Sequence, residues 1–548
     1  MKLIIDKLEF RRIILTVTGH FEGISGSEDI VLYFQEQRGD KRLFFDDVNV
    51  GKDKFNIRIN VLEICNEAPV PSGRWYLCAD IGEEKGLPAY VSDRVYDRIY
   101  LSQYDGTRTD LQIDYGQNNY WHGFSRLAPN KWQYYLHVDY EIPELIEGFF
   151  PNLVYSIKTT AHRAYRKVMK QGFQTFFNLC NRHIKKNGRR VFFTSARSAQ
   201  LSGNEKFVYE RMLERGLDKK YDISFDFRSS ITSHRSFKNK FEFTYKLATA
   251  DFIFCDDYQP ELYTNDYNPG VKIIQLWHAC GAFKTIGFER IGGHGAPAFT
   301  TRIHKCYTHV PVSSDHSADH NAEAFSIDRR KFYPVGVPRT DVFFDEEYKA
   351  ATRKKIMEAY PLLKDAGQVI MYAPTFRGVN ARDAYFPMQM INFHKLGTIL
   401  KKNNQIMLIK MHPFVRQKVD IPEEFRDYFI DMTSYPDINE LLMITDVLIT
   451  DYSSVIYEAA LLRLPMLFYA FDLESYVDDR GFYEPYEDIV PGKIVKTQIE
   501  LLRTMEENDY RSEKLDDFLK KNFNYLDGHA TDRVIDLIFG NGDGNSRA

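Results

Sequence analysis

The chain has 548 residues, of which 44% are hydrophobic and 27% are charged, and these fractions exclude a disordered, collagen-like or coiled-coil protein. Its 72 Lys and Arg residues and 76 Asp and Glu residues give a net charge of −4, so no overall basicity points to nucleic acid as a partner. The six cysteines are widely spaced without a CxxC pair, which excludes a zinc ribbon and a dithiol redox site and is typical of a reducing compartment.

The N-terminal segment MKLIIDKLEFRRIILTV does not have the pattern of a signal peptide, because acidic and basic residues interrupt its apolar stretch. No uninterrupted apolar run approaches the roughly 18 residues that a membrane-spanning helix needs. We therefore expect a cytoplasmic protein, either soluble or peripheral on a membrane.

Residues 1–140 contain short runs rich in β-branched and aromatic residues, with apolar and polar residues alternating from Phe55 to Val61. Turn residues such as those at 71–73 separate the runs. The pattern predicts a small all-β sandwich. The segment holds no grouping of acid, base and nucleophile, so we interpret it as an accessory domain.

Residues 141–190 are predicted to form a basic amphipathic helical linker. Between Lys158 and Arg190 lie ten Lys or Arg residues and no Asp or Glu, and Phe173, Phe176 and Phe177 are among the recurring apolar positions. Two interpretations have about equal support. The helix could contact an anionic membrane surface, or its aromatic side could pack on the next domain while its basic side is solvated.

From residue 191 onwards strands and helices alternate, which predicts an α/β fold with parallel sheets and helices on both faces. The strands fall into two series, so we expect two Rossmann-like lobes facing each other across a cleft. We place these lobes at residues 191–350 and 351–539, followed by a flexible tail at 540–548. In such sheets ligands bind beyond the carboxyl ends of the strands, and the chemically useful residues of this chain lie at such ends.

Two segments of the first lobe carry candidate site residues. His278 directly follows the apolar run VKIIQLW, where a histidine is well placed as a general base, and Lys284 could contact phosphate. The alternative is a core histidine bonded to the backbone. In GVPRTD, Arg339 offers a planar fork to phosphate or carboxylate and Asp341 could cap the following segment. The alternative there is a turn in which Arg339 pairs with a carboxylate.

Two segments of the second lobe also end buried strands. In YAPTFRG, Thr375 and Arg377 project from the loop, and Arg377 is a candidate for binding pyrophosphate. In LIKMHP, Lys410 and His412 share one face of the strand by the period of two and together could hold a phosphoryl oxygen. The alternative for both is a strand end with unrelated polar residues.

A third segment, TDYSSVIYE, joins a buried strand to a helix. Ser453 and Ser454 are predicted at the helix N-terminus, where free N–H groups bind phosphate well. Asp451 precedes them, and Glu458, one turn into the helix, could bind the hydroxyl pair of a ribose. Capping of the helix by either serine is an alternative that is compatible with phosphate binding.

Several signatures are missing from the sequence. It contains no GxxxxGK[ST] phosphate loop and no GxSxG elbow, and Asp256–Asp257 is only a weak match to an acidic metal–nucleotide pair. His316 and His320 are spaced i, i+4, but no HExxH motif accompanies them. We therefore expect no zinc there and assign no metal site.

Taken together, WHACGAFKT, GVPRTD, YAPTFR, KMHP and TDYSSVIYE resemble the CDP-glycerol glycerophosphotransferase family of wall teichoic acid synthesis, over about residues 190–535. The resemblance implies a GT-B-like fold and transfer of a polyol phosphate from CDP-glycerol or CDP-ribitol to a hydroxyl of a lipid-linked acceptor, with release of CMP. It implies that His278 and His412 are catalytic, and that Arg377, Ser453, Ser454 and Glu458 lie in donor-binding segments. The segment Trp277–Gly281 is more similar to the ribitol-phosphate branch.

In the scheme that this resemblance implies, His278 takes the acceptor proton while Lys410 and His412 neutralise the transferring phosphoryl group. No cofactor is required, although Mg²⁺ could assist. The acceptor would place the enzyme on the inner face of the cell membrane. Two alternatives remain: a GT-B sugar-nucleotide glycosyltransferase or epimerase, and a catalytically inactive interaction protein, since a fold does not fix a function.

Overall fold

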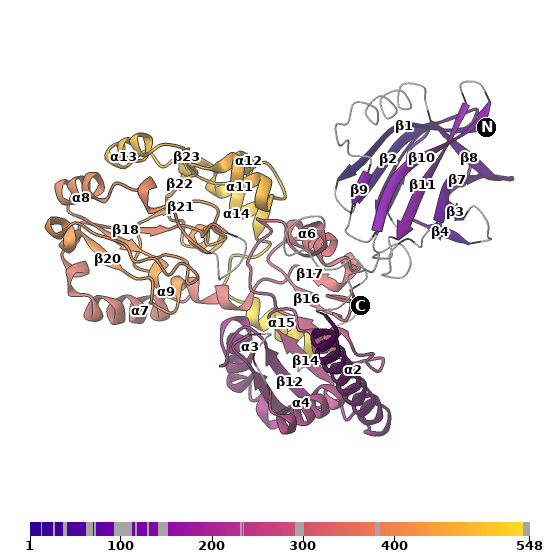
Figure 1. Cartoon of the computed structure of the whole chain (residues 1–548). Coiled ribbons are helices and arrows are strands. Elements are labelled where there is room, and N and C mark those ends of the chain that lie inside the picture. The colour runs from indigo at the N-terminus through magenta and orange to yellow at the C-terminus, as the bar shows by residue number, and fades with distance from the viewer. Residues whose placement is uncertain are drawn as a thin grey trace. The chain divides into compact units, whose positions relative to one another are not determined.

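In the computed structural model of the chain (Figure 1), the described residues are 1–11, 14–25, 28–36, 41–45, 47–61, 70, 73–91, 112–114, 118–128, 131–140, 152–230, 233, 235–290, 301–378 and 384–540. The chain divides into two compact units. The first comprises Met1–Gln171, Ile286–Lys305 and Ala322–Asp328, and the second comprises Gly172–Thr285, Cys306–Asn321 and Arg329–Ala548. Within the described residues, no helix combines the length and the apolar character needed to cross a membrane. The predicted tail lies almost wholly outside the described residues.

The first unit is built on strands, as the alternating sequence predicts. In β6, Phe55, Ile57 and Ile59 are buried while the residues between them face away from the core. The strands are β1 (Lys2–Arg11), β2 (Ile14–Glu22), β3 (Ile30–Glu36), β4 (Arg42–Phe44), β5 (Asp47–Val50), β6 (Lys54–Asn60), β7 (Gly73–Ile81), β8 (Glu84–Val91), β9 (Gln112–Asp114), β10 (Asn118–Ala128) and β11 (Lys131–Tyr140). The β-rich N-terminal domain is therefore confirmed.

The predicted sandwich of separate sheets is corrected in one respect, because all described strands join one eleven-stranded sheet. Its main path runs β4-β3-β7-β11-β8-β1-β2-β6-β5, and β10 and β9 extend from β11. Strand β11 pairs with both β7 and β8, and β1 pairs with β8 in parallel. These pairings join the edges that two separate sheets would have left free.

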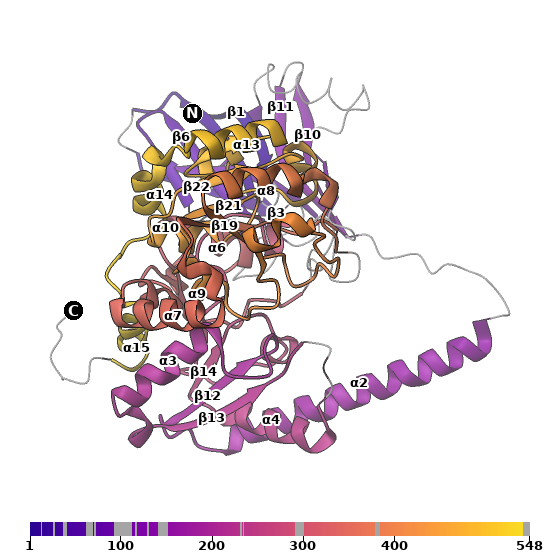
Figure 2. The ribbon, with the colours of Figure 1, turned by 90° about the vertical axis from the view of Figure 1, so that its left-hand side faces the viewer.

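Helix α2 (Asn152–His183) lies within the segment predicted as a helical linker, and its aromatic side is occupied. Phe173 and Phe176 contact Phe241 of α4 (Phe237–Thr249), with ring centroids 4.9 and 5.0 Å apart, and Phe177 packs on Tyr267. Figure 2 shows the C-terminal part of α2 running beside α4. This packing is the alternative that the sequence left open for the aromatic side, and it removes these rings from any membrane contact.

The second unit contains two parallel sheets. The first has the order β13-β12-β14-β15, so the chain leaves β12 in one direction and returns to its other side at β14. Its strands are β12 (Arg190–Ser195), β13 (Asp222–Phe227), β14 (Phe252–Cys255) and β15 (Lys272–Gln275). The elements that accompany them are α3 (Gly203–Glu214), α4, α5 (Pro260–Tyr263), β16 (Val310–Pro311), α6 (Asp315–Phe325) and β17 (Phe332–Tyr333).

The second parallel sheet has the order β20-β19-β18-β21-β22-β23, in which the strand order reverses between β18 and β21. This is the Rossmann order, as the sequence predicts. Its strands are β18 (Gln368–Ala373), β19 (Gln405–Ile409), β20 (Phe429–Asp431), β21 (Val447–Thr450), β22 (Met466–Tyr469) and β23 (Lys493–Val495). Its helices are α7 (Glu346–Ala359), α8 (Phe393–Lys402), α9 (Ile438–Leu442), α10 (Ile456–Leu461), α11 (Leu473–Arg480), α12 (Tyr486–Ile489), α13 (Gln498–Glu507) and α14 (Leu515–Asn522).

The last helix, α15 (Ala530–Phe539), does not belong with the second sheet, although the predicted boundary at 539 placed it there. Its buried residues Val534, Ile535 and Ile538 share one hydrophobic cluster with the strands of the first sheet. Its outer side is tied to α3, where Arg211 pairs with Asp532 at 2.8 Å. The chain therefore returns at its end to cover the first sheet.

Candidate active site

The candidate residues gather at the carboxyl ends of strands beside the two points where strand order reverses. In the first sheet, Asp256 and Asp257 follow β14, and Trp277 and His278 lie just beyond the neighbouring strand β15. In the second sheet, the loops after β18 and β21 carry the predicted donor-binding residues, and these two strands are hydrogen-bonded neighbours. Crevices at such reversals are where open α/β sheets bind their ligands.

His278 is partly accessible and lacks a close partner. About 34% of its side chain is exposed, and its Nδ1 lies 3.8 Å from the carboxylate of Asp257 without a hydrogen-bond partner in the described part of the chain. Burial of the ring, with the positive charges of Arg197 and Arg339, lowers the pKa of His278 to about 3, although the backbone of Asp256 opposes the shift. The imidazole is therefore neutral at pH 7 and able to accept a proton.

Asp257 sits close enough to influence this histidine. Burial raises the pKa of Asp257 to about 6, and the neighbouring Asp256 adds to the rise. Above that pH an ionised Asp257 would stabilise positive charge on His278 after a proton transfer. The sequence placed Asp257 directly after a buried strand, but we interpreted the acidic pair only as a weak metal–nucleotide motif.

Asn204 fixes the backbone on which His278 stands. Trp277 adopts φ +45°, a left-handed conformation that is strained for a residue with a large side chain. The buried Asn204 amide donates to the carbonyl oxygens of Leu276 and Trp277 at 3.1 and 2.6 Å. Its oxygen accepts from the backbone N–H of Arg339 at 3.0 Å, so one side chain joins the His278 and Arg339 segments.

Arg339 forms an ion pair with Glu458, which belongs to the second predicted lobe. This confirms the alternative in which Arg339 pairs with a carboxylate. Glu458 is only 3% exposed, and burial raises its pKa although Arg339 opposes the shift. A buried and paired carboxylate is not available to a ribose hydroxyl pair, so the predicted role of Glu458 is corrected to a structural one.

Arg377 is held in a buried network of two carboxylates. Its Nε and Nη2 bind Asp472 at 2.6 and 2.8 Å, and its Nη1 binds Asp451 at 2.9 Å and the Thr375 carbonyl oxygen at 2.8 Å. Asp451 also accepts from the backbone N–H and hydroxyl of Thr375 at 2.8 and 2.9 Å. Direct contact with pyrophosphate would displace one of these partners, so we interpret Arg377, Thr375 and Asp451 as the support of the donor-side loops.

Lys410 is turned into the fold. Its Nζ donates to the carbonyl oxygens of Thr433 and Tyr435 at 2.9 and 2.5 Å, the side chain is 8% exposed, and burial lowers its pKa. The period-two argument placed Lys410 and His412 on one face, but these two carbonyl groups occupy the ammonium group. Lys410 is therefore corrected from a phosphoryl ligand to an anchor between β19 and the segment after β20.

His412 is more accessible than Lys410 and lies against two aromatic rings. Its Nδ1 accepts from the backbone N–H of Phe414 at 3.2 Å, and its ring lies 4.6 Å from Phe376 and 4.7 Å from Phe414, between centroids. The bond at Nδ1 leaves the proton on Nε2 in the neutral ring. This tautomer presents a donor, which suits the predicted contact with phosphoryl oxygen.

Ser453 and Ser454 lie half-buried between β21 and α10. The Ser453 hydroxyl accepts from the backbone N–H of Val455 at 3.4 Å. The N-cap residue of α10 is Val455, so neither serine caps this helix. The predicted capping is therefore wrong, while phosphate binding stays a prediction.

Lys284 and Asp341 both have partners. The Lys284 ammonium donates to the Tyr476 hydroxyl at 3.3 Å. Asp341 accepts from the backbone N–H groups of Ala530 and Thr531 at 2.9 and 2.8 Å. Asp341 is thus a cap, as predicted, but of the distant helix α15 and not of the following segment.

Comparison with known proteins decides the family. Residues 175–540 match the family described as CDP-Glycerol:Poly(glycerophosphate) glycerophosphotransferase. The chain belongs to this family. It is 36% identical to the teichoic acid ribitol-phosphate polymerase TarL of Staphylococcus aureus, with 98% of this chain and 99% of that protein covered. It is 36% identical to the teichoic acid poly(ribitol-phosphate) polymerase of Bacillus spizizenii, over 88% of this chain and 77% of that protein.

A solved structure supports the fold of this glycerophosphotransferase-family member. The wall teichoic acid polymerase TagF aligns with a TM-score of 0.56 and 23% identity, covering 70% of this chain and 97% of that one. The predicted resemblance is therefore confirmed, and with it the enzyme class: the chain is a CDP-polyol polyolphosphotransferase.

Four residues of this glycerophosphotransferase-family site were missed as site residues: Arg197, Asn204, Asp257 and Asp472. Asp257 and Arg197 are each the second residue after a buried strand, a signal that the sequence did contain. Asn204 and Asp472 act through bonds to segments far away in the chain, and no local pattern marks such a bond.

Proposed function

We propose that this enzyme transfers ribitol phosphate from CDP-ribitol to a hydroxyl of a lipid-linked teichoic acid chain and releases CMP. The choice of ribitol rests on the near end-to-end similarity to ribitol-phosphate polymerases, which includes the N-terminal β-rich domain. The observation that carries the chemistry is the neutral, partly exposed His278 beside the positive charges of Arg197 and Arg339.

In the proposed reaction, the acceptor oxygen attacks the phosphorus atom that bears ribitol. A P–O bond forms to the acceptor, the bond to the CMP oxygen breaks, and His278 takes the acceptor proton. Arg197 and Arg339 would attract the donor phosphates, and the anion would in turn raise the pKa of His278 once the donor is bound. His412, through its protonated Nε2, and the backbone at Ser453 and Ser454 would hold the leaving CMP.

We further infer that the two parallel sheets form a GT-B-like pair, with the acceptor on the first and the donor on the second. The Arg339–Glu458 pair and the bond from the Thr285 N–H to the Gly481 oxygen at 3.3 Å support this arrangement. The donor side then corresponds to the Rossmann-ordered sheet.

The reaction is tested by measuring CMP release from CDP-ribitol and CDP-glycerol side by side, with a lipid-linked glycerol-phosphate acceptor analogue. We expect turnover with CDP-ribitol and little with CDP-glycerol. Turnover of CDP-glycerol alone would overturn the choice of polyol. Absence of CMP from both donors, with an acceptor that a known relative uses, would contradict the proposed reaction.

Asp257 gives the proposed reaction a specific pH dependence. The raised pKa of Asp257 means that it is ionised only above about pH 6, so kcat/KM for CDP-ribitol should fall as the pH drops through 6 and the negative charge beside His278 is lost. Asp257→Asn should lower kcat/KM at pH 8 and abolish this acidic limb. An unchanged limb in Asp257→Asn would show that another group is responsible.

We propose that the basic segment at the C-terminal end of α2 contacts the membrane surface, and its hydrogen bonds indicate which residues to test. Lys186 donates to the carbonyl oxygens of Ala248 and Ala250 at 2.8 Å each, and Arg190 bonds the carbonyl oxygen of Thr249, so these two cations hold the fold together. Lys185 and Arg189 are exposed. A contact through them would be electrostatic, because the neighbouring aromatic side is packed against α4.

We expect the double variant Lys185→Gln/Arg189→Gln to bind vesicles containing anionic lipid about thirtyfold more weakly than the unchanged chain, since each basic residue near the surface contributes about 1 kcal/mol. The measurement is a co-sedimentation assay at low salt. The matched control is Lys401→Gln/Lys402→Gln, which removes two exposed cations of α8. Equal vesicle binding by both double variants would refute a role for the α2 end.

A further inference from the structure

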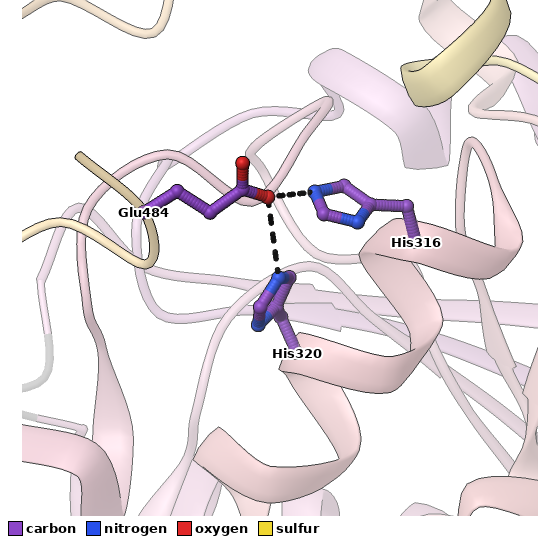
Figure 3. Close-up of side chains that lie close together, drawn as sticks. All are labelled: His316, His320 and Glu484. Atoms are coloured by element: carbon purple, nitrogen blue, oxygen red, sulfur yellow. Dashed lines mark ion pairs between the residues drawn. The ribbon is translucent and has the colours of Figure 1, made fainter. Parts of the chain in front are cut away.

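The second unit contains a cluster of two histidines and one carboxylate that has no part in the proposed reaction (Figure 3). His316 and His320 are four residues apart on α6, so their rings lie on one face of the helix. Glu484 comes from the segment just before α12 and reaches the same point. The Nε2 atoms of His316 and His320 lie 3.0 and 3.9 Å from one oxygen of Glu484, and the three ligand atoms lie within 4.8 Å of one another.

The two separations from the Glu484 oxygen bracket the spacing that a metal ion needs. Zinc bonds of about 2.0–2.1 Å in a tetrahedral site place neighbouring ligand atoms about 3.3 Å apart, between the two observed separations. A hydrogen bond accounts for the 3.0 Å separation of His316, and His320 presents its Nε2 to the same Glu484 oxygen at 3.9 Å. Three groups converging on one point, from two separate segments, is the arrangement that an ion requires.

The chemical state of the ligands is also suitable. Burial lowers the pKa of His316 and outweighs the opposing charge of Glu484, so the neutral imidazole that binds metals is favoured. Burial raises the pKa of the Glu484 carboxyl, but the bond and charge of Lys521 outweigh it and hold that pKa low, so Glu484 is ionised. Lys521 binds the second oxygen of Glu484. Glu484 would therefore bind the metal through its first oxygen only, and Lys521 would orient it as an outer partner.

Space for a further ligand adjoins the cluster. His316 and Glu484 line a cavity of about 300 Å³, together with Tyr457, Lys514 and Lys521. The Tyr457 hydroxyl is buried and has no hydrogen-bond partner among the described residues. Two His and one carboxylate are the donor set of zinc sites that keep a fourth position for water or substrate.

We propose that His316, His320 and Glu484 bind one divalent transition-metal ion of the zinc class, with a fourth position open to the adjoining cavity. The ion joins α6, which accompanies the first sheet, to the segment between α11 and α12, which accompanies the second. It is distinct from any Mg²⁺ that assists the leaving group, because borderline-soft imidazole ligands select zinc over magnesium. The sequence missed this site because Glu484 lies far from the histidine pair in the chain and no HExxH motif marks it.

The test uses the full chain without a histidine tag, stripped with EDTA and titrated with Co²⁺ as a spectroscopic probe and then with Zn²⁺. We expect one equivalent of Co²⁺ to bind, with visible absorption typical of a four- or five-coordinate site, and Zn²⁺ to displace it. His316→Ala, His320→Ala and Glu484→Gln should each weaken binding at least tenfold, since even outer partners of metal ligands contribute ten- to hundredfold. The readout needs no CDP-polyol, so it stands apart from the proposed reaction.

Two control variants separate a built site from surface histidine binding. His394→Ala removes an exposed histidine that is paired with Glu424 at 3.5 Å, and it should leave the affinity unchanged. Lys521→Met removes the outer partner of Glu484 but no ligand, and it should weaken binding less than His320→Ala does. His320→Asn provides a ligand-deficient variant of similar polarity if His320→Ala does not fold, as judged by circular dichroism. Absence of one-equivalent binding, or equal loss in His394→Ala and His320→Asn, would overturn the proposal.

Discussion

His278→Ala should lower kcat for CMP release from CDP-ribitol by at least a hundredfold, because a general base contributes roughly 10²–10⁴-fold. The neutral imidazole is the proton acceptor of the proposed reaction, and its pKa is held low by burial and by two positive charges. The measurement is initial-rate CMP release at saturating donor and acceptor. The side chain is a third exposed, and its Nδ1 has no hydrogen-bond partner among the residues that the structure describes, so its loss should cost little stability.

The controls for this test are the folding and the donor binding of the His278→Ala variant. His278→Ala should keep the circular dichroism spectrum and the affinity for CDP-ribitol, measured by calorimetry, within a few-fold of the unchanged chain. His278→Gln preserves polarity and volume but provides no base, and it should be as inactive as the alanine variant. Activity in His278→Gln close to that of the unchanged chain would remove His278 from the role of base.

Arg377→Met should destabilise the second sheet by about 3–5 kcal/mol, because it leaves two buried carboxylates without their cation. Asp451 is 1% exposed and Asp472 accepts two bonds from the same guanidinium group. The expected result is a matching loss of protection in hydrogen exchange of β18 and β21, whose following loops this network joins.

The matched control is Arg503→Met, which removes an exposed arginine paired with Glu507 one turn away on α13. A surface pair of this kind should change stability by less than about 1 kcal/mol. If Arg377→Met were as mild as Arg503→Met but raised KM for CDP-ribitol, the earlier prediction of direct pyrophosphate binding would be the better description.

The sequence predicted strands and their ends well, because a buried strand requires a continuous apolar run and the first polar residue marks its end. QVIMYA before Pro374 and VLIT before Asp451 are examples that the structure confirms as β18 and β21. It could not predict which way a polar side chain turns at that end. Lys410 and His412 both follow the buried strand β19, yet Lys410 turns inward because it donates to two carbonyl oxygens of the segment after β20.

Partners distant in sequence explain the other corrections. Asp341 was expected to cap the next residues, but the free N–H groups that it accepts from belong to α15. Glu458 was expected to face ribose, but Arg339 reaches it from the other predicted lobe. The sequence predicted that both carboxylates accept hydrogen bonds. The groups that donate to them come from distant segments, which only the folded structure identifies.

The return of α15 to the first sheet has a consequence for synthesis on the ribosome. The apolar surface of β12, β14 and β15 is complete once about half of the chain has emerged, but Val534, Ile535 and Ile538 arrive with the last residues. At roughly 5–20 residues per second, the nascent chain spends on the order of 10 to 50 seconds with that surface uncovered. The first sheet therefore stays without its covering helix α15 while the second sheet is translated. Chaperone binding in this period would protect the exposed apolar surface from aggregation.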